Sequence, residues 1–527
     1  MTDGLIKHIV IVGGGSAGWL SAAVIAAEHP SGLASGSGLQ ITLIESPNIP
    51  PIGVGEGTWP TMRETLAKIG VSETDFFREC DASFKQGSRF NRWRNNPVSG
   101  TDNDYYFHPF VLPQGYTETN LAAAWQAQHP NVPFADLVSF QPHLCVHGKA
   151  PKQVTTPEFA GVANYGYHLD AGKFGLFLRR HCIERLGVTY VADDVLAVNA
   201  HPNGDIASLQ TKAHGDIGGD LFIDCTGMQS LLLGKHYGIP VVSQQHVLFN
   251  DTALAVQVPY PDENSPIASQ TTSTAQSNGW IWDIGLPTRR GIGHVYSSAH
   301  SSDDAAEQAL RAYVRQTQPG LADAAIPTPR KIAFQPGYRQ KFWHHNCVAI
   351  GLSAGFIEPL EASALALVEL SASMVSDDMP ATRAAMEIVA QRFNDAFTYR
   401  WERVIDFLKL HYVLSQRTDS AYWIENRASA SIPPRLNELL TLWQHKPPSR
   451  YDFVRIEEIF PSASYQYVLY GMGFRTQAGT AARHSDHLEL ADGYFREAAA
   501  LTRKMLAALP GNRELIRHIS QHGMQKI

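Results

Sequence analysis

The sequence predicts an α/β fold with a doubly wound, Rossmann-like sheet, an antiparallel sheet and a mainly helical C-terminal part. Three observations predict it. An apolar run at 8–12 leads into a glycine-rich turn and a helix, the order found in a β-α-β unit. Strand-like runs return at 220–227 and 347–351, so the first sheet is expected to be assembled from distant segments. Residues 245–335 hold further strand-like runs with Gly and Pro breaks, typical of an antiparallel sheet.

Length and charge exclude several classes of protein. The chain has 527 residues, 44% of them hydrophobic, enough for more than one core. A net charge of −7 gives no basic surface for nucleic acid, and the basic cluster at 89–94 is short. Five scattered cysteines argue against disulfides and zinc and for a reducing compartment. Without a signal peptide or a run of about 18 apolar residues, we expect a cytoplasmic protein that does not enter a membrane.

The N-terminal turn predicts a dinucleotide site. His8–Val12 is apolar and β-branched, as buried parallel strands are. Gly13-Gly14-Gly15-Ser16-Ala17-Gly18 follows at once and contains G-x-G-x-x-G, and an Ala-rich helix is expected at 19–28. The glycines permit a tight turn and a close approach to the pyrophosphate, which the helix N-terminus then holds. The motif alone does not distinguish FAD from NAD.

The next segments extend this site. A second strand, at 39–44, ends at Glu45, and an acid there binds ribose hydroxyls. The connection at 31–38 is rich in Ser and Gly and is expected to be a flexible loop. Alternate glycines and several prolines at 49–60 exclude a regular helix or central strand and suit close packing on a flat ligand. A plain surface loop is the alternative, and a helix is expected at 61–69.

Lys85 lies in a segment, 81–90, that is either a strand or irregular. Taken by itself, a single lysine is expected at the surface. In a pocket it would instead be a point donor or a nucleophile of adjustable pKa. Residues 95–165 are rich in Pro, His, Tyr and Phe and are interpreted as an insertion with substrate-facing loops. Its histidines have no metal-ligand spacing.

Later segments return to the nucleotide domain. A helix is expected at 171–186 and strands at 188–191 and 195–198. The helix expected at 363–373 has free amides at its start that suit an anion or a flavin ring. Glu361 lies just before this helix, where a carboxylate is either a cap or a general base.

Two tryptophans mark the antiparallel region. Trp280 and Trp282 are two positions apart and therefore point to the same face of a strand. Two large rings on one face form either ordinary core or a rigid wall between two compartments.

The glycine fingerprint, the segment 53–60, Lys85, the double tryptophan and Glu358-Pro359-Leu360-Glu361 together resemble the flavin-dependent halogenases of the tryptophan halogenase family over most of the chain. Flavin hydroxylases share the glycine motifs but not the double tryptophan or the lysine. The resemblance implies FAD, reduced by a separate NAD(P)H-dependent flavin reductase, which reacts with O2 to a C4a-hydroperoxide. Chloride or bromide attacks it, and the hypohalous acid passes through a tunnel to a small aromatic substrate.

The resemblance also implies site residues. Lys85 corresponds to the lysine that hydrogen-bonds or captures the hypohalous acid, and Glu361 to the residue that stabilises or deprotonates the cationic intermediate. Ser363 and Ala364 match positions whose backbone amides hold halide. Trp280 and Trp282 would line the wall between flavin and substrate. The expected cofactor-binding residues are Gly13, Gly14, Gly15, Ala17, Gly18, Glu45, Gly55, Glu56, Gly57, Val195, Leu352 and Leu365; no metal ligand is expected.

Two departures bear on the substrate. The family's W-x-W-x-I-P has Pro directly after Ile, whereas Gly285 takes that place here and Pro287 comes later. Tryptophan-specific members have Glu-Ser-Thr-Gly after Pro-Leu, whereas this chain has Glu361-Ala362-Ser363-Ala364. The motif is closer to members that act on indole or simple indole derivatives, often with bromide preferred.

The expected organisation has six parts. They are FAD-binding segments at 1–95, 166–240 and 336–380 (the last also binding halide), a substrate-side insertion at 96–165, the antiparallel sheet at 241–335 and a helical substrate-side region at 381–527. Two other functions stay open from the sequence: an aromatic-hydroxylating flavin monooxygenase and a non-catalytic flavin-binding protein. A homodimer also stays open.

Overall fold

The computed structural model describes residues 5–31, 38–49, 55–98, 104–322, 325–455, 458–477 and 484–526, and for 484–487 the backbone alone. The flexible loop expected at 31–38 lies mostly outside the described residues, as does Gly53 in the segment 49–60. The chain divides into two compact units. Unit 1 comprises Met1–Ala82, Leu169–Gln244 and Gln335–Trp401, and unit 2 comprises Ser83–His168, Gln245–Phe334 and Glu402–Ile527. The finer six-part division stays a prediction.

Unit 1 is built on a six-stranded sheet in the order β20-β21-β12-β1-β2-β8. Neighbouring strands are parallel except β20 and β21 at one edge. Its members come from all three segments of the unit, which confirms a Rossmann-like fold assembled from distant pieces. The strands of unit 1 are β1 His8–Val12, β2 Gln40–Glu45, β3 Gly55–Gly57, β8 Thr189–Ala192, β9 Val195–Ala200, β10 Ile206–Thr211, β11 Gly215–Gly218, β12 Leu221–Asp224, β13 Val241–Ser243, β19 Gly337–Arg339, β20 Trp343–His344, β21 Cys347–Ala349 and β22 Gly355–Phe356.

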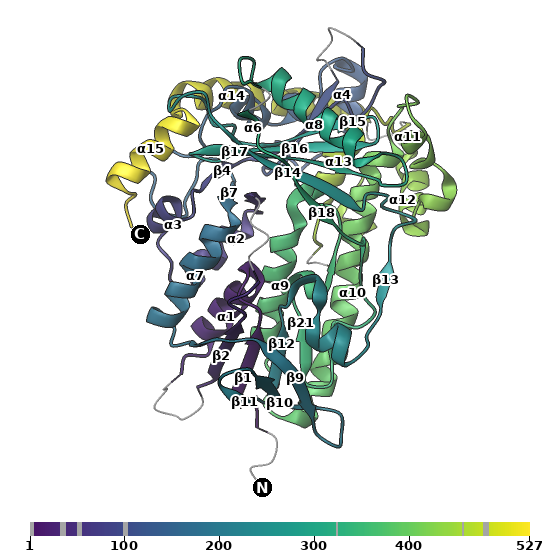
Figure 1. Cartoon of the computed structure of the whole chain (residues 1–527). Helices are drawn as coiled ribbons and strands as arrows, with labels where there is room; N and C mark the ends of the chain where they lie inside the picture. Colours follow the sequence, from purple (N-terminus) through teal and green to yellow (C-terminus); the bar gives the residue numbers. More distant parts are fainter. Residues whose placement is uncertain are drawn as a thin grey trace. The chain divides into compact units, whose positions relative to one another are not determined.

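The helices of unit 1 pack on this sheet through α1 Ser16–Glu28, which contacts β1 and β2. The other helices of the unit are α2 Thr61–Lys68, α3 Glu73–Glu79, α7 Ala171–Arg185, α9 Ser363–Asp377 and the first part of α10 Arg383–Val413, within which the unit ends. Figure 1 shows α1 in purple beside β1 and β2, and α1 also packs against α7 and α9. Ile9, Val10 and Ile11 are fully buried, as expected of a central parallel strand covered on both faces. Helix α1 begins at Ser16, three residues earlier than expected, because extended Gly15 is its N-cap.

Unit 2 contains a seven-stranded sheet in the order β18-β14-β17-β16-β15-β5-β6. The described strands within 241–335 pair antiparallel with one another, as expected. The sheet continues beyond this region on one side. Strand β5 pairs parallel to β15, with Ser88 opposite Thr271, and brings β6 with it. The strands of unit 2 are β4 Ser83–Lys85, β5 Gly87–Asn91, β6 Tyr105–Pro109, β7 Gly166–Asp170 (to His168), β14 Thr252–Pro259, β15 Thr271–Gln276, β16 Gly279–Gly285, β17 Arg289–Tyr296 and β18 Arg330–Ala333.

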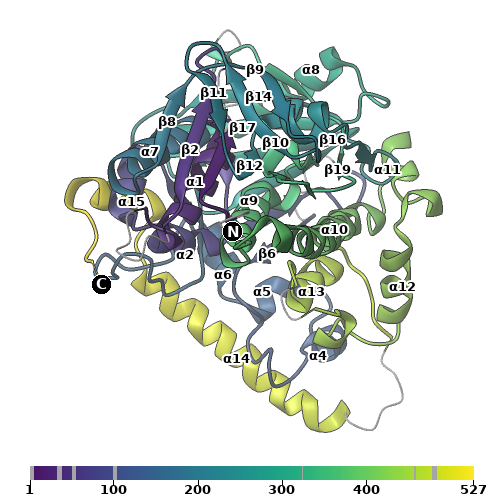
Figure 2. The same cartoon turned by 90° about the horizontal axis from the view of Figure 1, so that it is seen from below.

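Helices complete unit 2 and make its C-terminal part mainly helical, as expected. Helix α8 packs on β14 and β17, where its Leu310 and Val314 join a core with Val258 and Ile292. Figure 2 shows α14 in yellow beside α4, α5 and α6, which it contacts. The helices are α4 Ala122–Gln128, α5 Phe134–Val138, α6 Gln141–Val146, α8 Asp303–Thr317, α11 Ala421–Glu425, α12 Pro434–Trp443, α13 Ser462–Gly471, α14 His484–Ala508 and α15 Asn512–His522.

Three further observations concern groups named from the sequence. All five cysteines are buried free thiols. Within the described ranges, no cluster of three or more His, Cys, Asp or Glu side chains has the geometry to hold a metal ion. No helix of the described part of the chain is both long and apolar enough to cross a membrane.

Candidate active site

The glycine turn after β1 has the shape that a dinucleotide phosphate requires. A Cβ on Gly13, whose φ is 112°, would lie 2.2 Å from the carbonyl oxygen of Cys225. A Cβ on Gly18 would lie 1.8 Å from the carbonyl oxygen of Gly13. At Gly15, in contrast, a Cβ would meet nothing within 4 Å. Gly13 and Gly18 therefore allow the chain to pack tightly, and Gly15 leaves open space at the N-terminus of α1, where phosphate oxygens bind.

Glu45 ends β2 directly beside this turn. Its side chain occupies the place that a Cβ on Gly14 would need, since that atom would lie 2.1 Å from Glu45 Cδ. Arg179 Nη1 is 3.7 Å from Glu45 Oε2, and this oxygen is buried without a hydrogen-bond donor in the described residues. A buried acceptor of this kind fits a ribose hydroxyl. Val195 starts β9 nearby, because Asp193 N donates to Glu45 O over 3.0 Å.

Strand β3 supplies the next predicted cofactor residues, Gly55, Glu56 and Gly57. Burial raises the pKa of Glu56 to about 7. Leu352 lies in a short 3-10 helix, Gly351–Ser353, that contacts α1. A Cβ on Gly351 would lie only 2.7 Å from the Cβ of Ala17 in α1. Unit 1 therefore brings most of the predicted cofactor residues around one end of α1.

The chain before α9 has an unusual backbone. Glu361 has φ 65° and ψ 8°, and Ala362 has φ 54° and ψ 44°. Two successive non-glycine residues in the left-handed region are costly, and such strain is concentrated at functional sites. Ala362 occupies the N-cap and has no side chain that could accept a hydrogen bond from the helix. Glu361 is buried.

The predicted halide residues start this helix. Ser363 and Ala364 are the first two residues of α9, and the first N–H groups of a helix have no acceptor within it. The helix dipole adds positive potential at this end. The local geometry thus suits a small anion. Leu365, the next residue, is buried against the unit core.

Lys85 is buried in unit 2, with 1% of its surface exposed, so the surface position expected for an isolated lysine is wrong. It ends β4, which pairs antiparallel with β7 so that Lys85 lies opposite Gly166 and Ser83 opposite His168. The Lys85 ammonium lies 5.4 Å from the centre of the Phe110 ring. Burial of a cation costs free energy unless it has a specific environment, which favours a functional role.

His168 shares the Lys85 face of this strand pair, because opposite residues and residues two apart point the same way. Its Nε2 is 2.8 Å from Thr271 Oγ1. Burial, and after it the positive charge of Lys85, lowers the pKa of His168 well below its ordinary value. The imidazole is therefore neutral near pH 7 and leaves Lys85 as the cation of this face.

Trp280 and Trp282 share one face of β16, as predicted. Their ring centres are 6.4 Å apart at 61°, and Trp280 also contacts Trp93 at 6.3 Å. Trp282 lies over Gly293 of β17, whose Cβ would be 2.0 Å from Trp282 Cη2. Both rings are buried. They form a rigid aromatic layer, and their part in separating two compartments stays a prediction.

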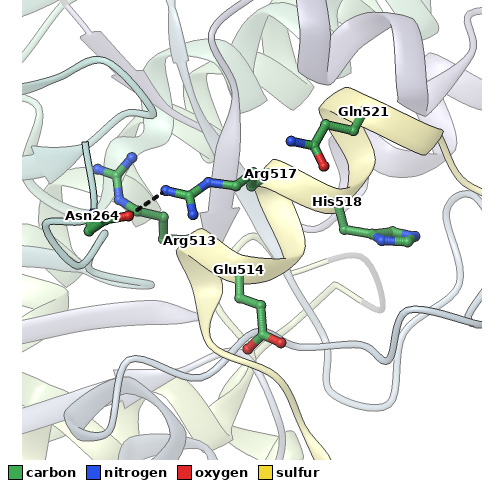
Figure 3. A pocket seen from close by; sticks show the side chains of 6 residues that line it. All are labelled: Asn264, Arg513, Glu514, Arg517, His518 and Gln521. Atoms are coloured by element: carbon green, nitrogen blue, oxygen red, sulfur yellow. Dashed lines mark hydrogen bonds between the residues drawn. The ribbon is translucent and has the colours of Figure 1, made fainter.

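A surface pocket of about 310 Å³ lies elsewhere in unit 2, on α15. Figure 3 shows its lining residues, with Arg517 extended toward Asn264, to whose side-chain oxygen it donates over 2.9 Å. Arg513 donates to the carbonyl oxygen of Pro287. Both arginines that line the pocket therefore already donate hydrogen bonds to oxygen atoms of the protein. None of the predicted site residues lines this pocket.

Sequence reasoning did not single out three residues of these sites. Phe110 and His168 lie beside Lys85, and Trp59 donates from its indole Nε1 to the backbone oxygen of Glu361 over 2.7 Å. Trp59 belongs to the glycine- and proline-rich segment that the sequence did mark. A large aromatic at the end of such a segment was the available signal, but its acceptor is about 300 residues away and is visible only in the fold.

Three features are typical of a dinucleotide-binding α/β protein. They are the glycine turn after β1, the acid Glu45 at the end of β2, and the N-termini of α1 and α9. Residues 8–486 match the family model described as tryptophan halogenase. The chain is 33% identical over 500 residues to the 7-chloro-L-tryptophan 6-halogenase KtzR of Kutzneria sp. (strain 744), covering 91% of this chain and 93% of that one.

Solved structures agree. The tryptophan halogenase from Shewanella frigidimarina NCIMB 400 has 50% identity and a TM-score of 0.95, with 99% of both chains covered. Tar14, a tryptophan C-6 flavin-dependent halogenase (chlorinase) from taromycin biosynthesis, has 31% identity and a TM-score of 0.89, with 97% of this chain and 99% of that chain covered. The chain belongs to the tryptophan halogenase family and is a flavin-dependent halogenase, as the sequence motifs implied. These relatives favour halogenation over the hydroxylase and non-catalytic alternatives.

Proposed function

We propose that the protein uses reduced FAD, O2 and chloride or bromide to halogenate the electron-rich ring of a small indole-containing substrate. The observation that carries this is Lys85, an ammonium buried in unit 2 beside the Phe110 ring. The family motif around Glu361 favours free indole or a simple derivative. The names of the relatives favour tryptophan instead, so both compounds are compared in the test.

The residues of unit 1 fit FAD. The open space at Gly15 suits the pyrophosphate, and Glu45 Oε2 is an unused acceptor for a ribose hydroxyl. When bound in the reduced form that a separate flavin reductase produces, FAD would supply two electrons that reduce O2 to the peroxide level, and this oxidant would convert halide to hypohalous acid. The amides of Ser363 and Ala364, at the positive end of α9, hold the halide for this reaction.

Lys85 and Glu361 act on the substrate side of the reaction. Lys85 donates a hydrogen bond that orients and polarises the hypohalous acid, a form of electrostatic catalysis. The ring carbon takes the halogen as the bond between halogen and oxygen breaks. The hydroxide that leaves takes a proton from the Lys85 ammonium and departs as water, and solvent later reprotonates Lys85 and takes up the ring proton from Glu361. The Glu361 carboxylate stabilises the ring cation and accepts the proton released from the ring carbon. Trp280 and Trp282 keep the oxidising chemistry apart from the substrate.

The test is the product mass formed from tryptophan and from indole with FAD, a flavin reductase, NADH, air and bromide. A product with the bromine isotope doublet is expected. Lys85→Met keeps the length of the side chain and removes its charge, so product is expected to fall by roughly a hundredfold or more. Lys152→Met is the matched control, because Lys152 is also fully buried in unit 2 but donates to the Pro157 carbonyl.

Three results would count against the proposal. They are a product heavier by one oxygen, a Lys85→Met variant as active as the wild type, and equal losses in both lysine variants. Melting temperatures of the two variants distinguish lost chemistry from lost folding. Relative rates with tryptophan and indole decide between the two substrates.

A further inference from the structure

The peptide that joins Glu361 to Ala362 is held at both of its polar atoms. Trp59 Nε1 donates to the Glu361 oxygen over 2.7 Å. The N–H of Ala362 donates to the Pro359 oxygen over 3.0 Å. All four residues belong to unit 1. The plane of this peptide is therefore fixed by one side-chain donor and one backbone acceptor.

The orientation of this peptide sets two functional features at once. The ψ of Glu361 directs where its carboxylate lies relative to the helix, and the φ of Ala362 directs the first turn of α9. Both residues are in the left-handed region, with φ 65° and 54°. Because this conformation is disfavoured for non-glycine residues, the chain would relax unless a specific contact opposed it. The indole N–H supplies such a contact.

Trp59 lies in the short connection between β3 and α2. It follows Gly57, the last predicted flavin residue of β3, by two positions. Helix α2 starts two residues later and is tied to α9, because Thr65 Oγ1 donates to Glu369 Oε1 over 2.5 Å and Thr61 Oγ1 to Glu369 Oε2 over 3.3 Å. The backbone that carries the indole therefore leads directly into a helix tied to α9, the helix whose start the indole supports.

We propose that Trp59 is a positioning residue that holds the Glu361–Ala362 peptide in the orientation required for both the Glu361 carboxylate and the halide-binding amides of α9. This inference rests on the proposed function for those groups. It assigns the tryptophan a role through its N–H donor rather than through its bulk. It predicts that losing the donor impairs bromide binding and turnover together, while FAD binding and stability change little.

The test uses two replacements of Trp59. Trp59→Phe removes the donor and part of the ring. Site-specific 3-benzothienylalanine keeps the shape of the indole and places sulfur where the N–H was. Either replacement is expected to raise the bromide KM and to lower kcat by about 3- to 10-fold each, the effect of one lost hydrogen bond to a neutral acceptor. The KM for the aromatic substrate and the Kd for FAD are expected to stay at wild-type values.

Trp343→Phe is the matched control. Its indole Nε1 also donates to a backbone oxygen of unit 1, that of His345, over 3.1 Å. This variant is expected to leave the bromide KM unchanged. A crystal structure of Trp59→Phe is expected to show the Glu361–Ala362 peptide rotated or in two conformations, a readout that does not depend on activity.

Two outcomes would overturn the inference. One is a benzothienyl variant with wild-type bromide KM and kcat. The other is a parallel loss of stability, FAD affinity and activity in Trp59→Phe and Trp343→Phe, which would show a packing role only. If the wild type binds bromide but forms no halogenated product, the proposed function fails, and the bromide Kd and the peptide orientation still decide the role of Trp59.

Discussion

Gly15 and Gly18 are three residues apart in the glycine-rich segment after β1, yet the space around their Cα atoms differs. Gly18 is tightly packed, whereas Gly15 has open space. A Cβ on Gly18 would lie 1.8 Å from the Gly13 oxygen, whereas one on Gly15 would meet no atom within 4 Å. The backbone of Gly15 has φ −76° and ψ −177°, an extended conformation that any residue type can adopt. A substitution at Gly15 is therefore expected to affect ligand binding, whereas a substitution at Gly18 is expected to affect folding.

Gly15→Ala is expected to leave the unfolding free energy of the apo-protein within about 0.5 kcal/mol of wild type and to raise the FAD Kd at least tenfold. Gly18→Ala is expected to destabilise the apo-protein by roughly 1–3 kcal/mol, as overpacking does. Urea unfolding of the apo-proteins and fluorescence titration with FAD measure the two quantities. Wild-type FAD affinity in Gly15→Ala would show that the cofactor does not approach this turn.

Lys85 illustrates what the sequence leaves undetermined at the scale of one residue. The residue types around it allowed a surface lysine or a pocket lysine. Its burial follows from the pairing of β4 with β7, whose partner residue, Gly166, is distant in the chain. Only the resemblance to the family marked Lys85 as a pocket lysine, because family motifs record chemistry, whereas local composition records only the average environment of a residue type.

At the scale of elements, β16 and β17 show how one glycine shapes an aromatic layer. The Trp282 ring lies over Gly293, in the space that a Cβ would fill at 2.0 Å from Cη2. Alternation predicted that Trp280 and Trp282 share a face, since the period of a strand is two. It could not predict the glycine beneath one ring, because the register of β16 with β17 selects that neighbour.

Gly293→Ala is expected to displace the Trp282 ring and to lower the unfolding free energy by roughly 1–3 kcal/mol. Near-UV circular dichroism reports the ring, and urea unfolding reports the free energy. Gly175→Ala in α7, where a Cβ would meet nothing within 4 Å, is the control. It is expected to stabilise the protein by up to about 1 kcal/mol through helix propensity. Unchanged dichroism in Gly293→Ala would contradict the packing described for Trp282.

At the scale of the whole molecule, each unit is built from three separate segments of the chain. The parallel sheet was predictable because its buried strands are apolar runs, recognisable at any place in the chain. The parallel pairing of β5 with β15 could not be predicted, because the sequence of a short strand carries little information about which strand it pairs with. The left-handed pair before α9 was likewise hidden, since Glu361 and Ala362 are not residue types that signal such a conformation.

Global stability is expected to depend on pH through Glu369, a side chain that joins α2 to α9. Burial raises the pKa of Glu369 from its ordinary value of 4.5 to about 8, against the hydrogen bonds from Thr65 and Thr61 that lower it. The folded state therefore keeps a proton that the unfolded chain loses above about 4.5. Glu369 therefore makes its full contribution to the unfolding free energy below pH 4.5. This contribution is lost as the pH rises through about 8, and the unfolding free energy falls by at most about 1.4 kcal/mol per pH unit.

Glu369→Gln replaces the carboxyl with a neutral amide of the same shape and is expected to remove this dependence. The variant should match the wild type near pH 5 and exceed its unfolding free energy above pH 8. Glu56, whose pKa burial raises to about 7, contributes with the same sign, so Glu56→Gln alone should flatten only part of the window. Urea unfolding at several pH values measures all three proteins. Parallel profiles for wild type and Glu369→Gln would mean that Glu369 is ionised in the folded state, and that α2 is tied to α9 by a charged carboxylate.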